Sequence, residues 1–236
     1  MNKIINIEYR RLIENNPFNH INSLKMRLIL LISCLTLITQ SILATETMEN
    51  QNNEGKTEKV TFGAGCFWCV EAIFERVKGV TDVQSGYSGG HVENPSYKEV
   101  CNGTTGHAEV CQLTYKPDVI SYIELLEIFW QTHDPTTLNR QGNDAGTQYR
   151  SVIFFHNSEQ QRLAEEMKKR LNNENIWNKP IVTEVVAFDK FYPAGDDHND
   201  YYEKNPTQSY CSVVITPKVQ KFEKIFREYI KEQKIH

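Results

Sequence analysis

Hydrophobic positions along the chain follow two spacings, one typical of strands and one typical of helices. Short apolar or alternating runs predict strands, and apolar residues three or four positions apart predict helices. Strands are expected at residues 60–62, 80–87, 109–115, 151–156, 181–188 and 210–216, and helices at 67–77, 117–132, about 163–171 and about 219–230. Because the two kinds of element interleave, we expect a sheet covered by helices, of either the α/β or the α+β class.

The pattern at the N-terminus is that of a secretory signal. Lys25 and Arg27 precede an apolar run at residues 28–38, and small residues follow up to Ala44. Basic, apolar and small segments in this order direct export, and the run is shorter than the ~20 residues of a membrane-spanning helix. We therefore expect an N-terminal extension with a signal peptide over residues 1–44, a flexible polar leader over 45–57 and a single domain over 58–236.

Such a signal implies a location outside the cytoplasm. We expect the protein in a bacterial periplasm or secreted, and in the cytoplasm if the N-terminal segment is not a working signal. A lipoprotein cleavage box at residues 31–34 is the less favoured alternative, because the apolar run continues beyond Cys34.

Composition narrows the function classes. A hydrophobic content of 39% with 11% aromatic residues supports a packed core, and a net charge of −4 gives no reason to expect nucleic-acid binding. Of the six cysteines, Cys34 lies in the signal, which leaves five in the exported chain. Five cysteines cannot all pair in disulfides, so at least one free thiol needs a chemical explanation.

Two of these cysteines, Cys66 and Cys69, flank an aromatic pair in the segment GCFWC. Cys66 follows a glycine-rich strand exit at the first turn of the predicted helix, where unpaired N–H groups and the helix dipole favour a thiolate and lower its pKa. Cys69 lies one turn later, within reach of an oxidised Cys66. Three alternatives are two buried small side chains, half of a zinc site, and the redox pair of a thioredoxin-type oxidoreductase. Zinc is disfavoured because the chain has no second CxxC pair.

Glu109 is the second candidate for chemistry. The alternation in HAEVCQLTY places Glu109 on the same strand face as Cys111, Leu113 and Tyr115. If that face is buried, the pKa of the Glu109 carboxyl rises and the group can act as a general acid near neutral pH. The alternative is a glutamate at a strand end that points to water.

Six blocks of sequence together resemble the A-type peptide methionine sulfoxide reductases. These blocks are GCFWC, SGYSGG, NPSYKEVCNGTTGHAEV, HDPTTLNRQGNDAGTQYRS, FYPAG and NPTQSYC, and they occur in the order found in that family. The resemblance extends over nearly all of residues 60–226. It implies an α+β fold, a two-layer sandwich with a mixed sheet covered by helices, and a catalytic domain that reduces the S epimer of methionine sulfoxide, free or in proteins, without metal or organic cofactor.

The resemblance also implies a role for each matched residue. Cys66 corresponds to the nucleophile, which becomes a sulfenic acid, and Glu109 to the acid that protonates the sulfoxide oxygen. The implied substrate-binding residues are Phe67 and Trp68, which hold the S-methyl group, Tyr97 and Tyr149, whose hydroxyls bind the sulfoxide oxygen, and Asp144.

A second thiol must resolve the sulfenic acid as a disulfide, which a thioredoxin or thioredoxin-like reductant then reduces. Cys69 is nearest to Cys66, whereas Cys211 matches the resolving position of relatives that lack Cys69. We expect Cys69 to react first and Cys211 to take the disulfide onward or to serve as backup. The partners expected are oxidised proteins, free methionine sulfoxide and the reductant, with no nucleic acid and no stable membrane span, and the protein is expected to be a monomer.

The chain departs from the family pattern at Gly195 and Asp197, which stand where a glutamate and a tyrosine are usual, while His198 is retained. These changes put local packing and contacts near the substrate in question. No catalytic role is expected for four other residues, namely Cys101, Cys111, His107 and His133.

Overall fold

A six-stranded sheet forms the centre of the computed structural model, which describes residues 55–232. The predicted signal peptide and most of the predicted leader lie outside the described residues. Neighbouring strands are antiparallel, except that β6 (Ser151–Phe155) and β7 (Glu184–Ala187) run parallel to each other. From edge to edge the strands are β7 (Glu184–Ala187), β6 (Ser151–Phe155), β1 (Glu58–Ala64), β3 (Ala108–Tyr115), β2 (Val80–Ser88) and β8 (Phe191–Pro193).

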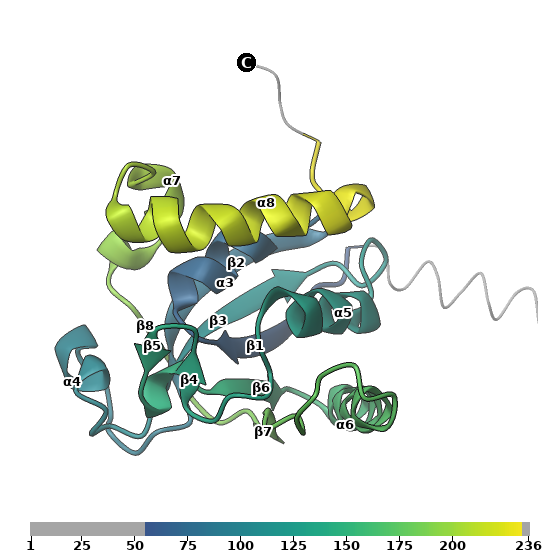
Figure 1. Ribbon diagram of the computed structural model, residues 1–236, viewed down its shortest axis with the longest axis horizontal. Coiled ribbons are helices and arrows are strands. Elements are labelled where there is room, and N and C mark those ends of the chain that lie inside the picture. The colour runs from purple at the N-terminus through teal and green to yellow at the C-terminus, as the bar shows by residue number, and fades with distance from the viewer. Residues whose placement is uncertain (1–54, 233–236) are drawn as a thin grey trace, which may run out of the picture. The chain divides into compact units, whose positions relative to one another are not determined.

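Helices cover one face of this sheet, as Figure 1 shows. Helix α3 (Phe67–Phe74) packs against β1, β3 and β2, and α8 (Thr216–Ile225) lies across α3. In the described residues, no helix is long and apolar enough to cross a membrane. The helices are α3 (Phe67–Phe74), α4 (Tyr97–Cys101), α5 (Tyr122–Thr132), α6 (Ser158–Asn173), α7 (Tyr201–Lys204) and α8 (Thr216–Ile225).

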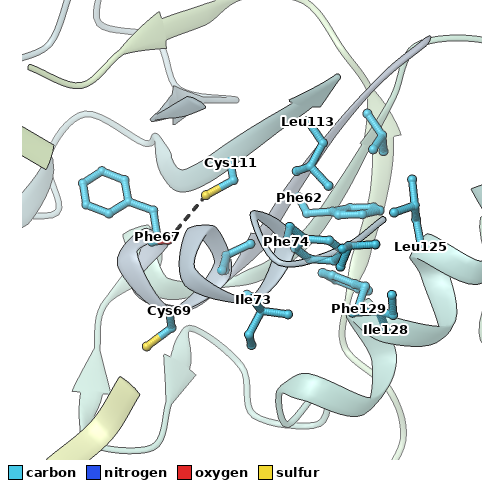
Figure 2. Close-up of a cluster of buried hydrophobic side chains, with 14 of the residues drawn as sticks. Phe62, Phe67, Cys69, Ile73, Phe74, Cys111, Leu113, Leu125, Ile128 and Phe129 are labelled. Carbon is cyan, nitrogen blue, oxygen red and sulfur yellow. Dashed lines mark hydrogen bonds between the residues drawn. The ribbon is translucent and has the colours of Figure 1, made fainter. Parts of the chain in front are cut away.

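The main core lies between α3 and the sheet. Phe62 of β1 stacks on Phe129 of α5 with ring centroids 4.8 Å apart, and Phe74 of α3 packs on the same ring of Phe62 at 5.5 Å (Figure 2). Leu113 of β3 is fully buried in this cluster. A smaller apolar cluster covers the opposite face of the sheet around Val110 and neighbouring residues. A mixed sheet with helices on one face is the α+β sandwich that the sequence resemblance implied.

Residues 210–216 were expected to form a strand, and this prediction is wrong. The segment forms a π-helix, η3 (Cys211–Ile215), which continues into α8. Its buried members, Cys211 and Ile215, are four positions apart and share one helical face, whereas Val213 between them is exposed. The run of β-branched residues favoured a strand locally, but packing of this face on the core decided otherwise.

Helix boundaries also differ from the prediction, and the last helix ends at Ile225 instead of near residue 230. The helix expected from residue 117 begins at Tyr122, because Ser121 and Glu124 form a capping box in which Ser121 Oγ accepts the N–H of Glu124. The helix expected to run to residue 77 ends at Phe74, and the N–H of Val77 donates to the Phe74 carbonyl in a turn. The first strand is longer than predicted and spans Glu58–Ala64.

Candidate active site

Cys66 lies at the junction between β1 and α3. Gly65 before it has a φ of +89°, which glycine adopts readily, and a Cβ at Gly65 would come within 2.6 Å of Gln141 Cβ. Cys66 then occupies the N-cap position of α3, and its carbonyl accepts the N–H of Cys69 at 3.1 Å. The strand, glycine and helix therefore place this cysteine at the helix start, as the sequence predicted.

Burial governs the ionisation of Cys66. Its side chain is 6% exposed, and desolvation, a hydrogen bond with Cys69 and the charge of Glu109 all raise the pKa of its thiol. The predicted lowering of this pKa by the helix start is therefore wrong. The dipole of an eight-residue helix is outweighed by the loss of water around the sulfur.

Glu109 lies on β3 and faces α3. Its side chain is 1% exposed, and its Oε2 accepts the N–H of Phe67 at 3.1 Å. Burial raises the pKa of this carboxyl to about 8, and the nearby charge of Asp144 adds to the effect. Of the two alternatives left open by the sequence, the structure has the buried carboxyl, and its pKa is raised as expected for that case. The group therefore carries a proton at neutral pH and lies at the N–H of the residue after Cys66.

Aromatic rings form a wall beside Cys66. The ring of Phe67 is fully buried and lies 5.9 Å from that of Trp68 and 6.4 Å from that of Tyr97. His198 adds a ring 4.5 Å from Tyr97, and Tyr201 stacks on Trp68 at 3.7 Å with an interplanar angle of 8°. The predicted substrate-binding residues Phe67, Trp68 and Tyr97 therefore lie close together. His198 and Tyr201, from the segment after β8, complete this aromatic wall.

The long loop between α5 and β6 supplies the other predicted residues. Asp144 lies in β5 (Asp144–Ala145), which pairs with β4 (Arg140–Gln141), and Tyr149 ends the short helix η1 (Thr147–Tyr149). Burial raises the pKa of the Tyr149 hydroxyl, and the charge of Glu109 raises it further, which places Tyr149 near that carboxyl. Asp144 Oδ2 accepts the hydroxyl of Tyr210 at 2.7 Å.

The structure brings Cys69 to Cys66 and leaves Cys211 in the core. Cys69 is 2% exposed, and the neighbouring Cys66 side chain lowers the pKa of its thiol to about 7. Cys211, the first residue of the π-helix, is fully buried. All five cysteines in the described residues are free thiols. Cys111 lies in the core, where it donates to the Phe67 carbonyl at 3.4 Å (Figure 2).

Three site residues were not singled out from the sequence. Tyr210 contacts Asp144 and lies 3.9 Å from Cys69 Sγ through its hydroxyl, and His198 and Tyr201 belong to the aromatic wall. The adjacency of Tyr210 to Cys211 was the one available signal for it. His198 had been noted only as a retained residue beside Gly195 and Asp197, both of which lie outside the aromatic wall.

His107 and His133, for which no catalytic role was expected, make hydrogen bonds to backbone and hydroxyl groups. His107 Nδ1 accepts the N–H of Gly90 at 3.0 Å, and His133 hydrogen-bonds the Phe129 carbonyl and Ser151 Oγ, each at 2.7 Å. Burial lowers the pKa of His133 to about 4, so its ring is neutral. Within residues 55–232, His, Cys, Asp and Glu form no group of three or more that could hold a metal ion.

The sequence comparisons all identify the same protein family. The sequence profile of the peptide methionine sulfoxide reductases matches residues 58–230. The peptide methionine sulfoxide reductase MsrA of Saccharolobus solfataricus is 56% identical over 174 residues, which cover 74% of this chain and 97% of the relative. The enzyme of the same name from Sulfolobus acidocaldarius is 58% identical over 169 residues, covering 72% and 95%.

Solved structures show the same fold. Mxr1 from Saccharomyces cerevisiae in its reduced form is similar with a TM-score of 0.61 and 36% identity, over 66% of this chain and 90% of that one. Methionine sulfoxide reductase A of Corynebacterium diphtheriae gives a TM-score of 0.59 and 34% identity, over 65% and 78%. The chain therefore belongs to the A-type peptide methionine sulfoxide reductases, oxidoreductases that reduce methionine sulfoxide and so repair oxidised proteins.

Proposed function

We propose that the chain reduces the S epimer of methionine sulfoxide, in proteins and as the free amino acid, with Cys66 as nucleophile and Glu109 as proton donor. The observation that carries this assignment is the protonated carboxyl beside the cysteine. Glu109 has a pKa raised to about 8 and is hydrogen-bonded to the N–H of Phe67, the residue after Cys66. A sulfoxide oxygen leaves only when it is protonated, and a buried acid of this kind supplies the proton.

The first step transfers oxygen from the substrate to the enzyme. The Cys66 sulfur attacks the sulfoxide sulfur while Glu109 donates a proton to the oxygen, and the hydroxyls of Tyr97 and Tyr149 stabilise the charge that develops there. The oxygen then passes to Cys66: its bond to the Cys66 sulfur forms as the substrate S–O bond and the new sulfur–sulfur bond break, so methionine leaves and Cys66 becomes a sulfenic acid. The thiol proton of Cys66 restores Glu109, so protons and oxygen balance.

The aromatic wall selects the substrate. Phe67 and Trp68 present apolar faces to the S-methyl group, and Tyr201 holds the indole of Trp68 in place by stacking. The buried Nε1 of Trp68 and Nδ1 of His198 make no hydrogen bond within the described residues. Such donors and acceptors are available to polar atoms around the sulfoxide, because a buried polar group without a partner is costly.

The sulfenic acid is resolved inside the protein. Cys69 attacks Cys66 first, which forms a disulfide and releases water, and Cys211 takes the disulfide onward or acts as backup. A thioredoxin-like dithiol then reduces the disulfide. The position of Cys69 one helical turn from Cys66, where its N–H donates to the Cys66 carbonyl at 3.1 Å, supports this order, since full burial of Cys211 requires a local opening before it can react. We further propose that the protein is exported, on the basis of the signal-like segment at residues 25–44, and that it works as a monomer.

An assay on separate S and R epimers tests the proposal. With dithiothreitol as reductant, the S epimer should give methionine, whereas the R epimer should give almost none. Equal rates on both epimers, or catalysis of disulfide exchange in a reduced test protein without methionine formation, would contradict it. The latter result would instead favour a general disulfide oxidoreductase built on Cys66 and Cys69.

A further inference from the structure

Glu71 is a buried acid that takes no part in the reaction proposed above. It lies on α3 and is 1% exposed. Both of its carboxyl oxygens have a partner outside the helix. Ser85 Oγ of β2 donates to Oε1 at 3.2 Å, and the N–H of Tyr201, the first residue of α7, donates to Oε2 at 3.3 Å. Glu71 therefore joins the helix that follows the nucleophile to a central strand and to the segment that completes the aromatic wall.

The bond to Tyr201 supplies what α7 lacks at its own start. The first N–H groups of a helix have no partner within it, and the side chain of the residue before the helix commonly caps them. Here that residue is Asp200, whose backbone is left-handed with a φ of +53° and whose side chain makes no capping hydrogen bond. Glu71 takes this place from a different helix, so the position of Tyr201 depends on it.

Tyr201 in turn holds the indole of Trp68. The two rings stack with centroids 3.7 Å apart and an interplanar angle of 8°. The indole Nε1 is buried and makes no hydrogen bond within the described residues, so packing rather than a polar contact orients this ring. Trp68 and Glu71 are three positions apart on α3 and share one side of the helix, which is why Tyr201 can contact both.

We propose that Glu71 is a positioning residue of the substrate pocket. By holding the N–H of Tyr201, it keeps the tyrosine ring against Trp68, whose face receives the S-methyl group. This inference rests on the function proposed above, because it concerns how the same pocket binds methionine sulfoxide. Since Glu71 acts through these two rings, its loss should weaken substrate binding more than it slows the chemistry at Cys66.

The ion pairs of α7 do not replace this buried contact. Arg76 pairs with Glu203, and Lys204 pairs with Asp200 at 3.2 Å. Glu203, Lys204 and Asp200 all have side chains more than half exposed, at 55%, 54% and 54%. Exposed pairs contribute little to holding a segment in place, because water and salt screen their charges. The carboxyl of Glu71 is thus the buried polar anchor of Tyr201.

Steady-state kinetics on the S epimer, with dithiothreitol as reductant, compare four single variants. Glu71→Met removes both acceptors at similar side-chain length, whereas Glu71→Gln keeps an oxygen for the N–H of Tyr201 and an amide N–H for Ser85 Oγ. Ser85→Ala is the matched control, because it removes the other partner of the same carboxyl and leaves the bond to Tyr201. Tyr201→Leu removes the ring through which Glu71 acts. Urea unfolding measures the stability of each variant separately.

For Glu71→Met we expect KM to rise about three- to fivefold with kcat within about twofold of the wild type, a smaller change than loss of the indole itself would cause. Glu71→Gln should restore most of the wild-type KM. Ser85→Ala should leave KM within about twofold, whatever its cost in stability. The double variant of Glu71→Met and Tyr201→Leu should have the KM of Tyr201→Leu alone, because residues that act through one contact are not additive.

Three results would overturn the inference. They are an unchanged KM in folded Glu71→Met, an equal rise of KM in Ser85→Ala, and an effect of Glu71→Met that is as large in the Tyr201→Leu background as in the wild type. If Glu71→Met does not fold, Glu71→Asp carries the same comparison, because it withdraws the carboxyl from the N–H of Tyr201 and keeps the charge. A wild type that forms no methionine would refute the proposed function, on which the inference rests.

Discussion

Replacing Glu109 by glutamine should make the enzyme slower and change how its stability depends on pH. The glutamine Oε1 can still accept the N–H of Phe67, which Glu109 Oε2 accepts at 3.1 Å, so the fold should be kept. The proton donor is lost, and we expect methionine formation to fall by roughly 10²–10⁴-fold, the usual contribution of one positioned acid. In the wild type the rate should fall as pH rises through about 8, the pKa of Glu109, and the variant should lack this inflection.

The effect on stability follows from the same pKa. An unfolded chain loses the Glu109 proton near pH 4.5, whereas the folded protein keeps it until about pH 8. Between these values the folded state binds more protons, so the free energy of unfolding of the wild type decreases as pH rises. The slope is about 1.4 kcal/mol per pH unit, or at most about 4 kcal/mol from pH 5 to pH 8. Glutamine removes this slope because it does not titrate.

Urea unfolding of both proteins at several pH values between 5 and 8, followed by tryptophan fluorescence, measures the difference. The stability of Glu109→Gln relative to the wild type should increase steadily with pH, whatever constant cost the buried amide adds. Glu174→Gln, at an exposed position after α6, is the matched control and should show no such increase. A difference that stays constant with pH would mean that the folded protein does not hold Glu109 protonated, which would refute the reasoning.

Three further predictions concern the thiols and the aromatic wall. Cys66→Ser should abolish reduction of the S epimer, because a hydroxyl is a far weaker nucleophile towards sulfur than a thiol, and substantial activity in an epimer assay would remove Cys66 from the mechanism. Cys69→Ser should accumulate the sulfenic acid in single-turnover thiol counting, whereas Cys211→Ser should form a Cys66–Cys69 disulfide at the normal rate; the reverse pattern would mean that Cys211 resolves first. Trp68→Leu should raise KM roughly tenfold with a smaller change in kcat, as expected for the loss of about 1.4 kcal/mol of aromatic contact, and steady-state kinetics with an unchanged KM would contradict this role.

Local sequence determined the secondary structure that surrounds Cys66. The order of strand, glycine and helix around Cys66 was predictable because a positive φ and helical periodicity are properties of neighbouring residues. The alternation of β3 likewise placed Glu109 on the same face as Cys111 and Leu113, because successive strand residues point to opposite sides of a sheet, but it left open whether that face is buried. The identity of the family rested on motifs in the same order.

Tertiary structure decided what neighbouring residues could not. Residues 210–216 have the composition of a strand, yet they form a π-helix because their buried positions pack on the core at helical spacing. The pKa of Cys66 rises instead of falling, because burial removes more stabilisation from the thiolate than the helix start supplies. Tyr210 reaches Cys69 only through the packing of the C-terminal segment on α3, and a contact between residues more than 140 positions apart leaves no periodic signal in the sequence.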